Sequence, residues 1–100
     1  MCKYTEKFFT NQDYLARTSK NLDHLMELLK KPVTDPFHYN ARILSTIKIA
    51  EKHQGIVSFK QDCYKIIIIE ISFKSEALKK AFEEDINANR ELLMLTMLIT

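Results

Sequence analysis

The chain has 100 residues, of which 46% are hydrophobic and 28% are charged, and its formal net charge is +2 at pH 7. This composition excludes a disordered chain and suits one globular domain over residues 1–100. Lysines and arginines are spread along the sequence, unlike the concentrated basic surface of a dedicated nucleic-acid binder. No run of about 20 apolar residues occurs, so we expect no transmembrane helix and no membrane partner. With no signal-peptide pattern and only two cysteines, we expect an intracellular protein, in the cytoplasm or an organelle matrix.

The N-terminal third predicts a strand followed by a helix. Residues 3–9 (KYTEKFF) are rich in aromatic and β-compatible side chains, which favours a strand. Thr10 suits the N-cap of a helix with Asp13 in its first turn, and Pro32 ends that helix because proline has no backbone N–H. The apolar residues between these two ends share one helical stripe: Leu15, Leu22, Leu25, Met26 and Leu29.

The middle of the chain predicts a second helix and then a β-hairpin. Asp35 is expected as the N-cap, Pro36 as the first helical residue and Gly55 as a left-handed C-cap. After Gly55 the apolar period changes from 3.6 to 2, which indicates strands over residues 56–59 and 64–73.

The turn of this hairpin is expected at Gln61–Asp62, and its second strand contains four consecutive isoleucines. Alternate residues of a strand point to opposite faces. We expect the helix-facing set to be Ile67, Ile69, Ile71 and Phe73. The other set is more apolar than an open face needs, so the inserted helix or another molecule should cover it: Tyr64, Ile66, Ile68, Glu70 and Ser72.

The C-terminal quarter predicts a third helix and a final strand. Ser75 is a suitable N-cap with Glu76 in the first turn, and the asparagines of residues 87–89 are expected to end the helix. Residues 92–99 suit either a strand or a helix, and their place after a helix and a turn favours a strand.

The order of these elements predicts the fold class. It is β-α-(α)-β-β-α-β, the split pattern of an α+β, ferredoxin-like βαββαβ sandwich with a helical insertion in the first crossover. Such a sheet packs its helices on one face and leaves the other face open to solvent or to a partner.

The sequence offers little chemistry for catalysis or cofactor binding. A single glycine excludes a glycine-rich phosphate loop, and His24, His38 and His53 are too far apart for the spacing of metal ligands. Asp23 and His24 with Cys63 contain the residue types of a nucleophilic site, without a spacing that specifies one. We therefore expect no catalytic residues, no metal and no cofactor.

Aromatic residues alternate with lysines in two segments, KYTEKFF and FKQDCYK. Basic side chains of this kind contact phosphates, while aromatic rings stack on bases. Core packing and solubility explain the same residues equally well, so both interpretations stay open.

Three segments together resemble the small-subunit ribosomal protein six family: MCKYTEKFF as the first strand, HQGIVSF as the passage from helix to strand, and YKIIIIEISFKSEALKKAFEEDINANRELLMLTMLI as the remainder. The resemblance implies a ferredoxin-like ribosomal protein that binds ribosomal RNA and an adjacent ribosomal protein, number eighteen. The family's long basic hairpin is shortened here to KQDCYK, and the first crossover is longer than the family's. Four residues carry the implied RNA contacts: Lys3, Tyr4, Lys60 and Lys65.

Two hypotheses follow, and neither is enzymatic. The first is a structural component of a ribonucleoprotein that contacts RNA through those four residues. The second is a small protein-interaction or regulatory module that homodimerises through the open sheet face, with Tyr64, Ile66 and Ile68 as its partner face. Salt dependence separates the two, because phosphate contacts weaken steeply as salt rises and apolar contacts do not.

Overall fold

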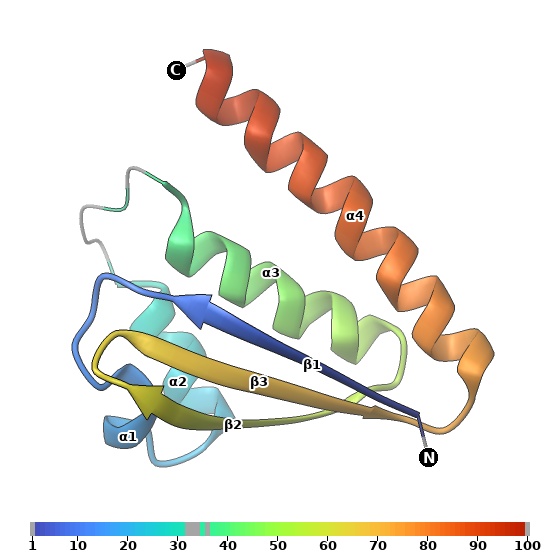
Figure 1. Ribbon diagram of the computed structural model, residues 1–100, viewed down its shortest axis with the longest axis horizontal. Coiled ribbons are helices and arrows are strands. Elements are labelled where there is room, and N and C mark those ends of the chain that lie inside the picture. Colours follow the sequence, from blue (N-terminus) through green and yellow to red (C-terminus); the bar gives the residue numbers. More distant parts are fainter. Residues whose placement is uncertain (1, 32–34, 36, 100) are drawn as a thin grey trace.

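A computed structural model describes the backbone of residues 2–31, 35 and 37–99 and the side chains as far as residue 92. The described chain forms a small α+β fold with one sheet and a layer of helices (Figure 1). The elements in chain order are β1 (Cys2–Phe9), α1 (Leu15–Thr18), α2 (Leu22–Leu29), α3 (Tyr39–Lys52), β2 (Ile56–Cys63), β3 (Ile66–Phe73) and α4 (Glu76–Ile99).

The sheet is antiparallel with the strand order β1-β3-β2, so the isoleucine-rich strand β3 lies at its centre. Glu70 of β3 stands between Thr5 of β1 and Ser58 of β2. Helices α1, α2 and α3 all occur between β1 and β2, which confirms the helical insertion in the first crossover. The α+β class is also confirmed.

The core lies between the sheet and the helices. Four alternate side chains of β3 have no exposed surface, and they are the predicted set Ile67, Ile69, Ile71 and Phe73. The helices cover them with Leu25, Leu29, Ile43, Ile47, Ala50, Phe82 and Ile86. Because full burial of one large aliphatic or aromatic side chain contributes about 1.5–3 kcal/mol, this alternation fixes which face of the sheet carries the helices.

The first helix begins later than predicted, because Thr10 is not its N-cap. The Thr10 backbone N–H donates to the Lys65 carbonyl oxygen at 2.9 Å and so extends the ladder between β1 and β3. The buried Thr10 hydroxyl donates to the Asn40 side-chain oxygen at 3.1 Å. Thr10 therefore joins the end of β1 to the start of α3, and α1 begins only at Leu15.

The single predicted helix is in fact two short helices with a break between them. At the break, the Ser19 hydroxyl donates to the Leu15 carbonyl oxygen at 2.7 Å. The Asn21 side-chain oxygen accepts from the His24 backbone N–H at 2.8 Å and caps α2. Short polar side chains that bond to the nearby backbone compete with helix continuation, and the Thr-Ser-Lys-Asn run supplies several of them.

Helix α3 begins at Tyr39, four residues after the predicted N-cap. Asp35 nevertheless caps it, because its carboxylate accepts from the backbone N–H groups of Tyr39 at 2.8 Å and Asn40 at 2.9 Å. The residue adjacent to the helix is His38, with a left-handed φ of 56°. The predicted role of Pro36 lies outside the described residues.

The end of α3 differs from the prediction by one residue. Gln54, with φ of 63°, takes the left-handed position, while Gly55 does not have a positive φ. The Gln54 N–H donates to the Glu51 carbonyl oxygen at 3.1 Å and the Gly55 N–H to that of Ala50 at 2.8 Å, which is the Schellman pattern. Glycine is required at position 55 for space, because a Cβ there would lie 2.6 Å from Ile71 Cγ2.

The hairpin turn is at Tyr64–Lys65 and not at Gln61–Asp62, because β2 continues to Cys63. The strand passes an irregularity between Gln61 and Cys63, where the pairing register shifts. At this point the Gln61 amide donates to the Ile66 carbonyl oxygen at 3.1 Å. A side chain that holds both strands together lets the hairpin extend beyond the predicted turn.

The predicted final strand is wrong, since α4 runs without a break through residues 87–89 and 92–99. Ser75 is confirmed as its cap, with its side-chain oxygen accepting from the Leu78 N–H at 3.2 Å. Leucine and methionine are better helix formers than strand formers, and an asparagine inside a helix costs less than about 1 kcal/mol. The described sheet therefore lacks the fourth strand of a complete ferredoxin-like pattern.

Candidate functional site

The face of the sheet away from the helices is the first candidate, and we call it the outer sheet surface. Among the described helices only α3 reaches it, at one end, where the Tyr39 ring meets the Phe9 ring edge to face with centroids 5.0 Å apart, and the rest of the surface is uncovered (Figure 1). The side chains of β3 on this side are half-buried by their neighbours, in contrast to the fully buried set that faces the helices. The surface consists of Lys3, Thr5, Lys7, Phe9, Ile56, Ser58, Lys60, Ile66, Ile68, Glu70 and Ser72.

Strand register places an apolar centre among charges on this surface. Ile68 stands between Lys7 of β1 and Lys60 of β2, and Ile66 lies opposite Phe9, which is 47% exposed. Two lysines are already paired: Lys3 Nζ lies 3.3 Å from Glu70 Oε1, and Lys7 Nζ lies 3.4 Å from Asp62 Oδ2. Among the residues that the structure describes, Lys60 has no ion-pair partner.

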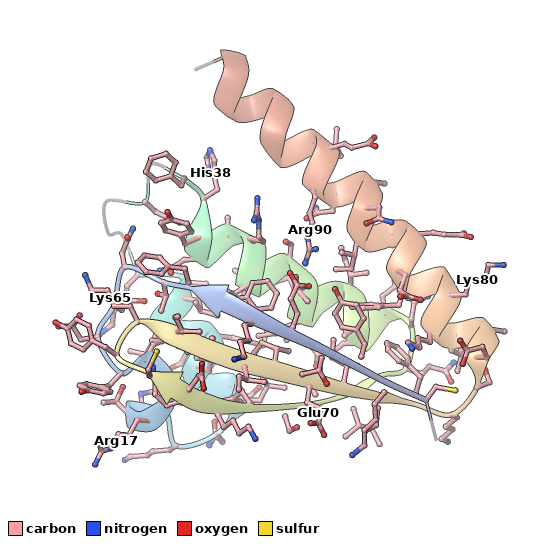
Figure 2. The ribbon with its side chains drawn as sticks, in the orientation of Figure 1. Arg17, His38, Lys65, Glu70, Lys80 and Arg90 are labelled. Atoms are coloured by element: carbon pink, nitrogen blue, oxygen red, sulfur yellow. The ribbon has the colours of Figure 1, made fainter. Side chains whose placement is uncertain are left out.

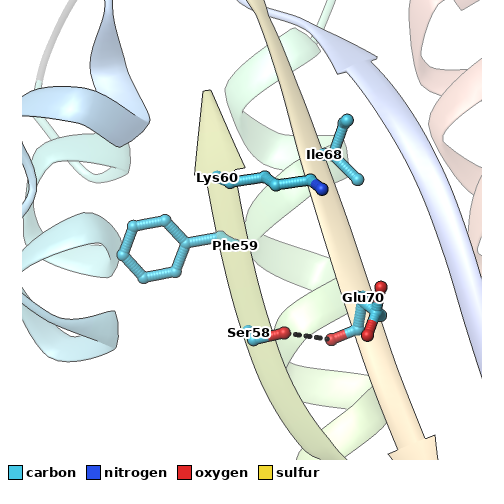
Figure 3. A pocket seen from close by; sticks show the side chains of 5 residues that line it. All are labelled: Ser58, Phe59, Lys60, Ile68 and Glu70. Atoms are coloured by element: carbon cyan, nitrogen blue, oxygen red, sulfur yellow. Dashed lines mark hydrogen bonds between the residues drawn. The ribbon is translucent and has the colours of Figure 1, made fainter. Parts of the chain in front are cut away.

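A depression of about 200 Å³ lies on the outer sheet surface, between β2 and β3 (Figure 3). Lys60 and Ile68 line one end of it and Ser58 and Glu70 the other, with the Ser58 hydroxyl donating to the Glu70 backbone oxygen at 3.4 Å. The Phe59 ring points away from these four side chains, toward the helices. The depression thus presents one aliphatic side chain, one free cation and one carboxylate.

The second candidate is a group of aromatic and charged residues at the hairpin turn, all exposed except the half-buried Lys65, which we call the turn cluster: Asp13, Tyr14, Arg17, Tyr64 and Lys65. The two tyrosine rings meet edge to face with centroids 5.4 Å apart. The Arg17 guanidinium lies 5.6 Å from the Tyr14 ring centroid, and Lys65 Nζ lies 5.6 Å from that of Tyr64. The Tyr64 hydroxyl donates to the Asp13 carboxylate at 2.6 Å, a bond that raises the pKa of Tyr64.

The fold brings the turn cluster together by docking α1 on the hairpin. The Tyr14 backbone N–H donates to the Tyr64 carbonyl oxygen at 2.9 Å. The Gln61 side-chain oxygen accepts from the N–H groups of Ala16 at 2.9 Å and Arg17 at 3.2 Å. Sequence reasoning did not select Asp13, Tyr14 or Arg17 as site residues. Their only signal was an aromatic residue and charges in the loop after the first strand, and their approach to the turn depends on long-range contacts.

The predicted RNA-contact residues do not form one group. Lys3 and Lys60 are exposed on the outer sheet surface. Lys65, which is labelled in Figure 2, lies in the turn cluster. Tyr4 is on the opposite face of the sheet, where its ring meets the Phe82 ring edge to face at 5.0 Å. Its hydroxyl donates to the Glu6 carboxylate, and burial raises the pKa of Tyr4 to about 12.

The predicted partner-face residues are also divided between the two candidates. Ile66 and Ile68 lie side by side with the charged residues of the outer sheet surface. Tyr64, which is 51% exposed, lies beyond the end of the strand and belongs to the turn cluster.

Titratable groups elsewhere join elements of the fold. His53 Nε2 at the end of α3 lies 2.6 Å from Asp85 Oδ2 of α4, and Lys52 Nζ lies 3.2 Å from the same oxygen. The hydrogen bond from His53 and the contact with Lys52 lower the pKa of Asp85. The Cys2 thiol donates to the Glu76 carboxylate at 3.0 Å, which raises the pKa of that thiol. Within the described part of the chain, no group of three or more His, Cys, Asp or Glu residues is arranged to hold a metal ion.

Comparison of the chain with protein families, with characterised proteins and with solved structures gives no match. Among the described helices, none combines the length and the apolar character that crossing a membrane requires.

Proposed function

We propose that the protein is a non-catalytic interaction module that self-associates through the outer sheet surface. The observation that carries the proposal is the position of Ile66 and Ile68. These side chains lie on the central strand, where flanking strands shield their edges, but no described helix covers them. An apolar centre with a polar, charged rim is the usual anatomy of a protein interface.

The charges around the isoleucines fit a protein partner better than a polyanion. Lys3 and Lys7 are held near carboxylates of the same chain, which reduces the positive potential that RNA phosphates would meet. A second copy of the surface offers apolar contacts for Ile68, and its carboxylates can pair with Lys60. We also propose that the fold is a ferredoxin-like arrangement without its final strand, supported by the strand order β1-β3-β2, which matches the first three strands of that pattern.

The substitution Ile68→Glu tests this proposal. Register places the new carboxylate between Lys7 and Lys60, so we expect the folded monomer to lose only about 1 kcal/mol of stability. We expect sedimentation velocity to give the mass of a dimer for the wild-type chain and of a monomer for the variant. Circular dichroism checks that the variant keeps its fold.

The matched control is Ala77→Glu, which adds the same charge at an exposed position in the first turn of α4. This variant should retain the dimer. A wild-type chain that is still a monomer at about 100 µM, a concentration at which micromolar association is detected, would contradict the proposal. So would a dimer that persists in Ile68→Glu.

A second candidate function, RNA binding in a ribonucleoprotein, is favoured by the turn cluster. Two cations lie over two exposed tyrosine rings there, a combination that suits contact with single-stranded RNA. If this function is correct, affinity for a single-stranded RNA falls steeply between 50 and about 200 mM salt, and Lys65→Ala weakens it further. Fluorescence anisotropy measures both effects, and Lys48→Ala on α3 is the control for loss of one exposed charge.

A further inference from the structure

Strand β1 forms one border of the sheet over its full length of eight residues. Among the described residues, no strand pairs with its outward side (Figure 1). The sequence predicted a fourth strand, and in a ferredoxin-like sheet that strand would lie beside β1. Its residues are instead the last turns of α4.

The hydrogen-bond phase shows which backbone groups face outward. The Thr10 N–H donates to the Lys65 carbonyl oxygen, one position beyond the pair of Phe9 and Ile66. Bonded pairs alternate along an antiparallel ladder, so the even-numbered residues of β1 bond to β3. The N–H and C=O groups of Lys3, Thr5, Lys7 and Phe9 therefore point away from β3, along the open edge.

Helix α4 leaves this edge open, because it contacts β1 through the even-numbered side chains. Tyr4 packs on Phe82, and the Glu6 carboxylate lies 2.6 Å from Arg90 Nη2. These contacts lie on the helix-facing side of the strand. The odd-numbered side chains of β1 are exposed on the other side.

The exposed side of the edge carries two lysines, Lys3 and Lys7. Their ion pairs with Glu70 and Asp62 are exposed to solvent and contribute less than about 1 kcal/mol each, so carboxylates of an added strand can compete for both lysines. The side chains of Lys3 and Lys7 are 61% and 65% exposed and stand on either side of Thr5. Their carboxylate partners belong to β3 and β2, on the side away from the open edge. A strand added to β1 would place its own side chains directly beside these two lysines.

We propose that the open edge of β1 binds an extended segment of another protein as a fourth strand, and that this segment carries acidic side chains opposite Lys3 and Lys7. Backbone groups at alternate residues supply the hydrogen bonds, and the lysines select acidic residues. The inference goes beyond the proposed self-association, since it uses a different surface and a different partner.

A second copy of β1 fits the edge poorly. Antiparallel pairing centred on Thr5 would set Lys3 opposite Lys7 of the other copy. Pairing centred on Glu6 would set two Glu6 side chains opposite each other, although each already bonds to Tyr4 and Arg90 of its own chain. Like charges directly opposite destabilise a strand pair. These are the registers that would pair most of the strand. Charge disfavours the first and crowding of two Glu6–Arg90 pairs disfavours the second, so the edge fits an acidic segment better than a second copy.

The test uses two labelled peptides of about eight residues, one of alternating glutamate and valine and one of alternating lysine and valine. Fluorescence anisotropy at low protein concentration is expected to show at least about tenfold tighter binding of the acidic peptide, a difference of about 1.4 kcal/mol. The double variant Lys3→Glu, Lys7→Glu should reverse this preference.

A backbone variant separates strand addition from simple charge attraction. Thr5→Pro removes one outward N–H but no bond of the β1–β3 ladder, and proline is tolerated on edge strands. We expect this variant to lower the affinity for the acidic peptide at least about tenfold, equivalent to about 1.4 kcal/mol, and to leave the circular dichroism spectrum unchanged. An acidic peptide N-methylated at every second residue provides the same test without altering the protein. Two such peptides exist, one methylated at the odd-numbered and one at the even-numbered residues. Only the peptide whose methyl groups face away from β1 should bind.

Equal binding of both peptides, equal binding in both methylation phases, or no binding at millimolar peptide would overturn the proposal. So would a wild-type dimer that dissociates in Thr5→Pro, because a second copy would then occupy the edge. Self-association through Ile68 is measured by sedimentation velocity in the absence of peptide. Failure of that proposal is therefore distinguishable from failure of this one.

Discussion

Gly55 and Gln54 show how two adjacent residues at one helix end meet different physical demands. Gln54 holds the left-handed backbone of the Schellman motif, a conformation that costs a side-chain-bearing residue about 1 kcal/mol relative to glycine. Gly55 holds ordinary backbone but lies against Ile71 and Phe73, where a Cβ would approach to 2.6 and 2.9 Å. The first residue is under conformational strain, and the second is under a packing constraint.

Substitutions at these two positions should therefore change stability in opposite directions. We expect Gly55→Ala to lower the free energy of unfolding by about 1–3 kcal/mol, because both neighbouring side chains are fully buried. We expect Gln54→Gly to raise it by up to about 1 kcal/mol. Urea denaturation measures both changes, and a loss of stability in Gln54→Gly would show that its side chain has a role beyond the backbone.

At the scale of elements, α1 depends on a strand that is far away in the sequence. It has four residues, and its N-cap residue Tyr14 makes no side-chain cap hydrogen bond. So short a helix is marginal on its own. The Gln61 side chain of β2 supplies the missing acceptor for the first N–H groups of α1, and the same amide group donates to the Ile66 carbonyl oxygen. One side chain thus holds α1, β2 and β3 in place.

Removal of this side chain should loosen the turn cluster before it unfolds the sheet. We expect Gln61→Ala to destabilise the fold by about 1–2 kcal/mol, the usual cost of losing a helix cap. Amide hydrogen exchange should become faster in α1 and at the turn but not in α3. Lys60→Ala is the control, because Lys60 is adjacent to Gln61 in the sequence and its side chain is exposed and makes no ion pair among the described residues. An equal effect of both substitutions would argue against the capping role of Gln61.

At the scale of the whole molecule, the contact of β1 with α4 makes the free energy of unfolding depend on pH in the alkaline range. The folded protein raises the pKa of Tyr4 to about 12, from the ordinary value of 10, chiefly through burial. The neutral tyrosine is therefore favoured in the folded state. This contribution is complete below pH 10 and is lost as the pH rises from 10 through about 12.

We expect Tyr4→Phe to remove this part of the alkaline loss. The wild-type free energy of unfolding should decline with pH above 10 more steeply than that of Tyr4→Phe. The difference in slope should be smaller than the limit of about 1.4 kcal/mol per pH unit for one proton, because Tyr4 keeps partial contact with solvent. Urea titrations between pH 9 and about 12 measure this difference. Parallel slopes would show that Tyr4 titrates normally.

The sequence was a good guide to burial and a poorer guide to boundaries. Alternation in the isoleucine run predicted the buried face of β3, because the side-chain period of two leaves only one way to cover Ile67, Ile69 and Ile71. The final strand could not be decided in this way, because leucine and methionine patterns suit either structure. The turn cluster was not predictable, since Tyr14 and Tyr64 meet only when α1 docks on the hairpin.

The central position of β3 also has a consequence for the order in which the chain assembles during synthesis. The β2–β3 hairpin joins neighbouring segments, but β1 must pair with residues about 60 positions later in the chain. On the ribosome, KYTEKFF is therefore made long before any strand exists to receive it. The lysines and the glutamate of this segment keep it charged until β3 has been synthesised, which disfavours aggregation of the unpaired strand.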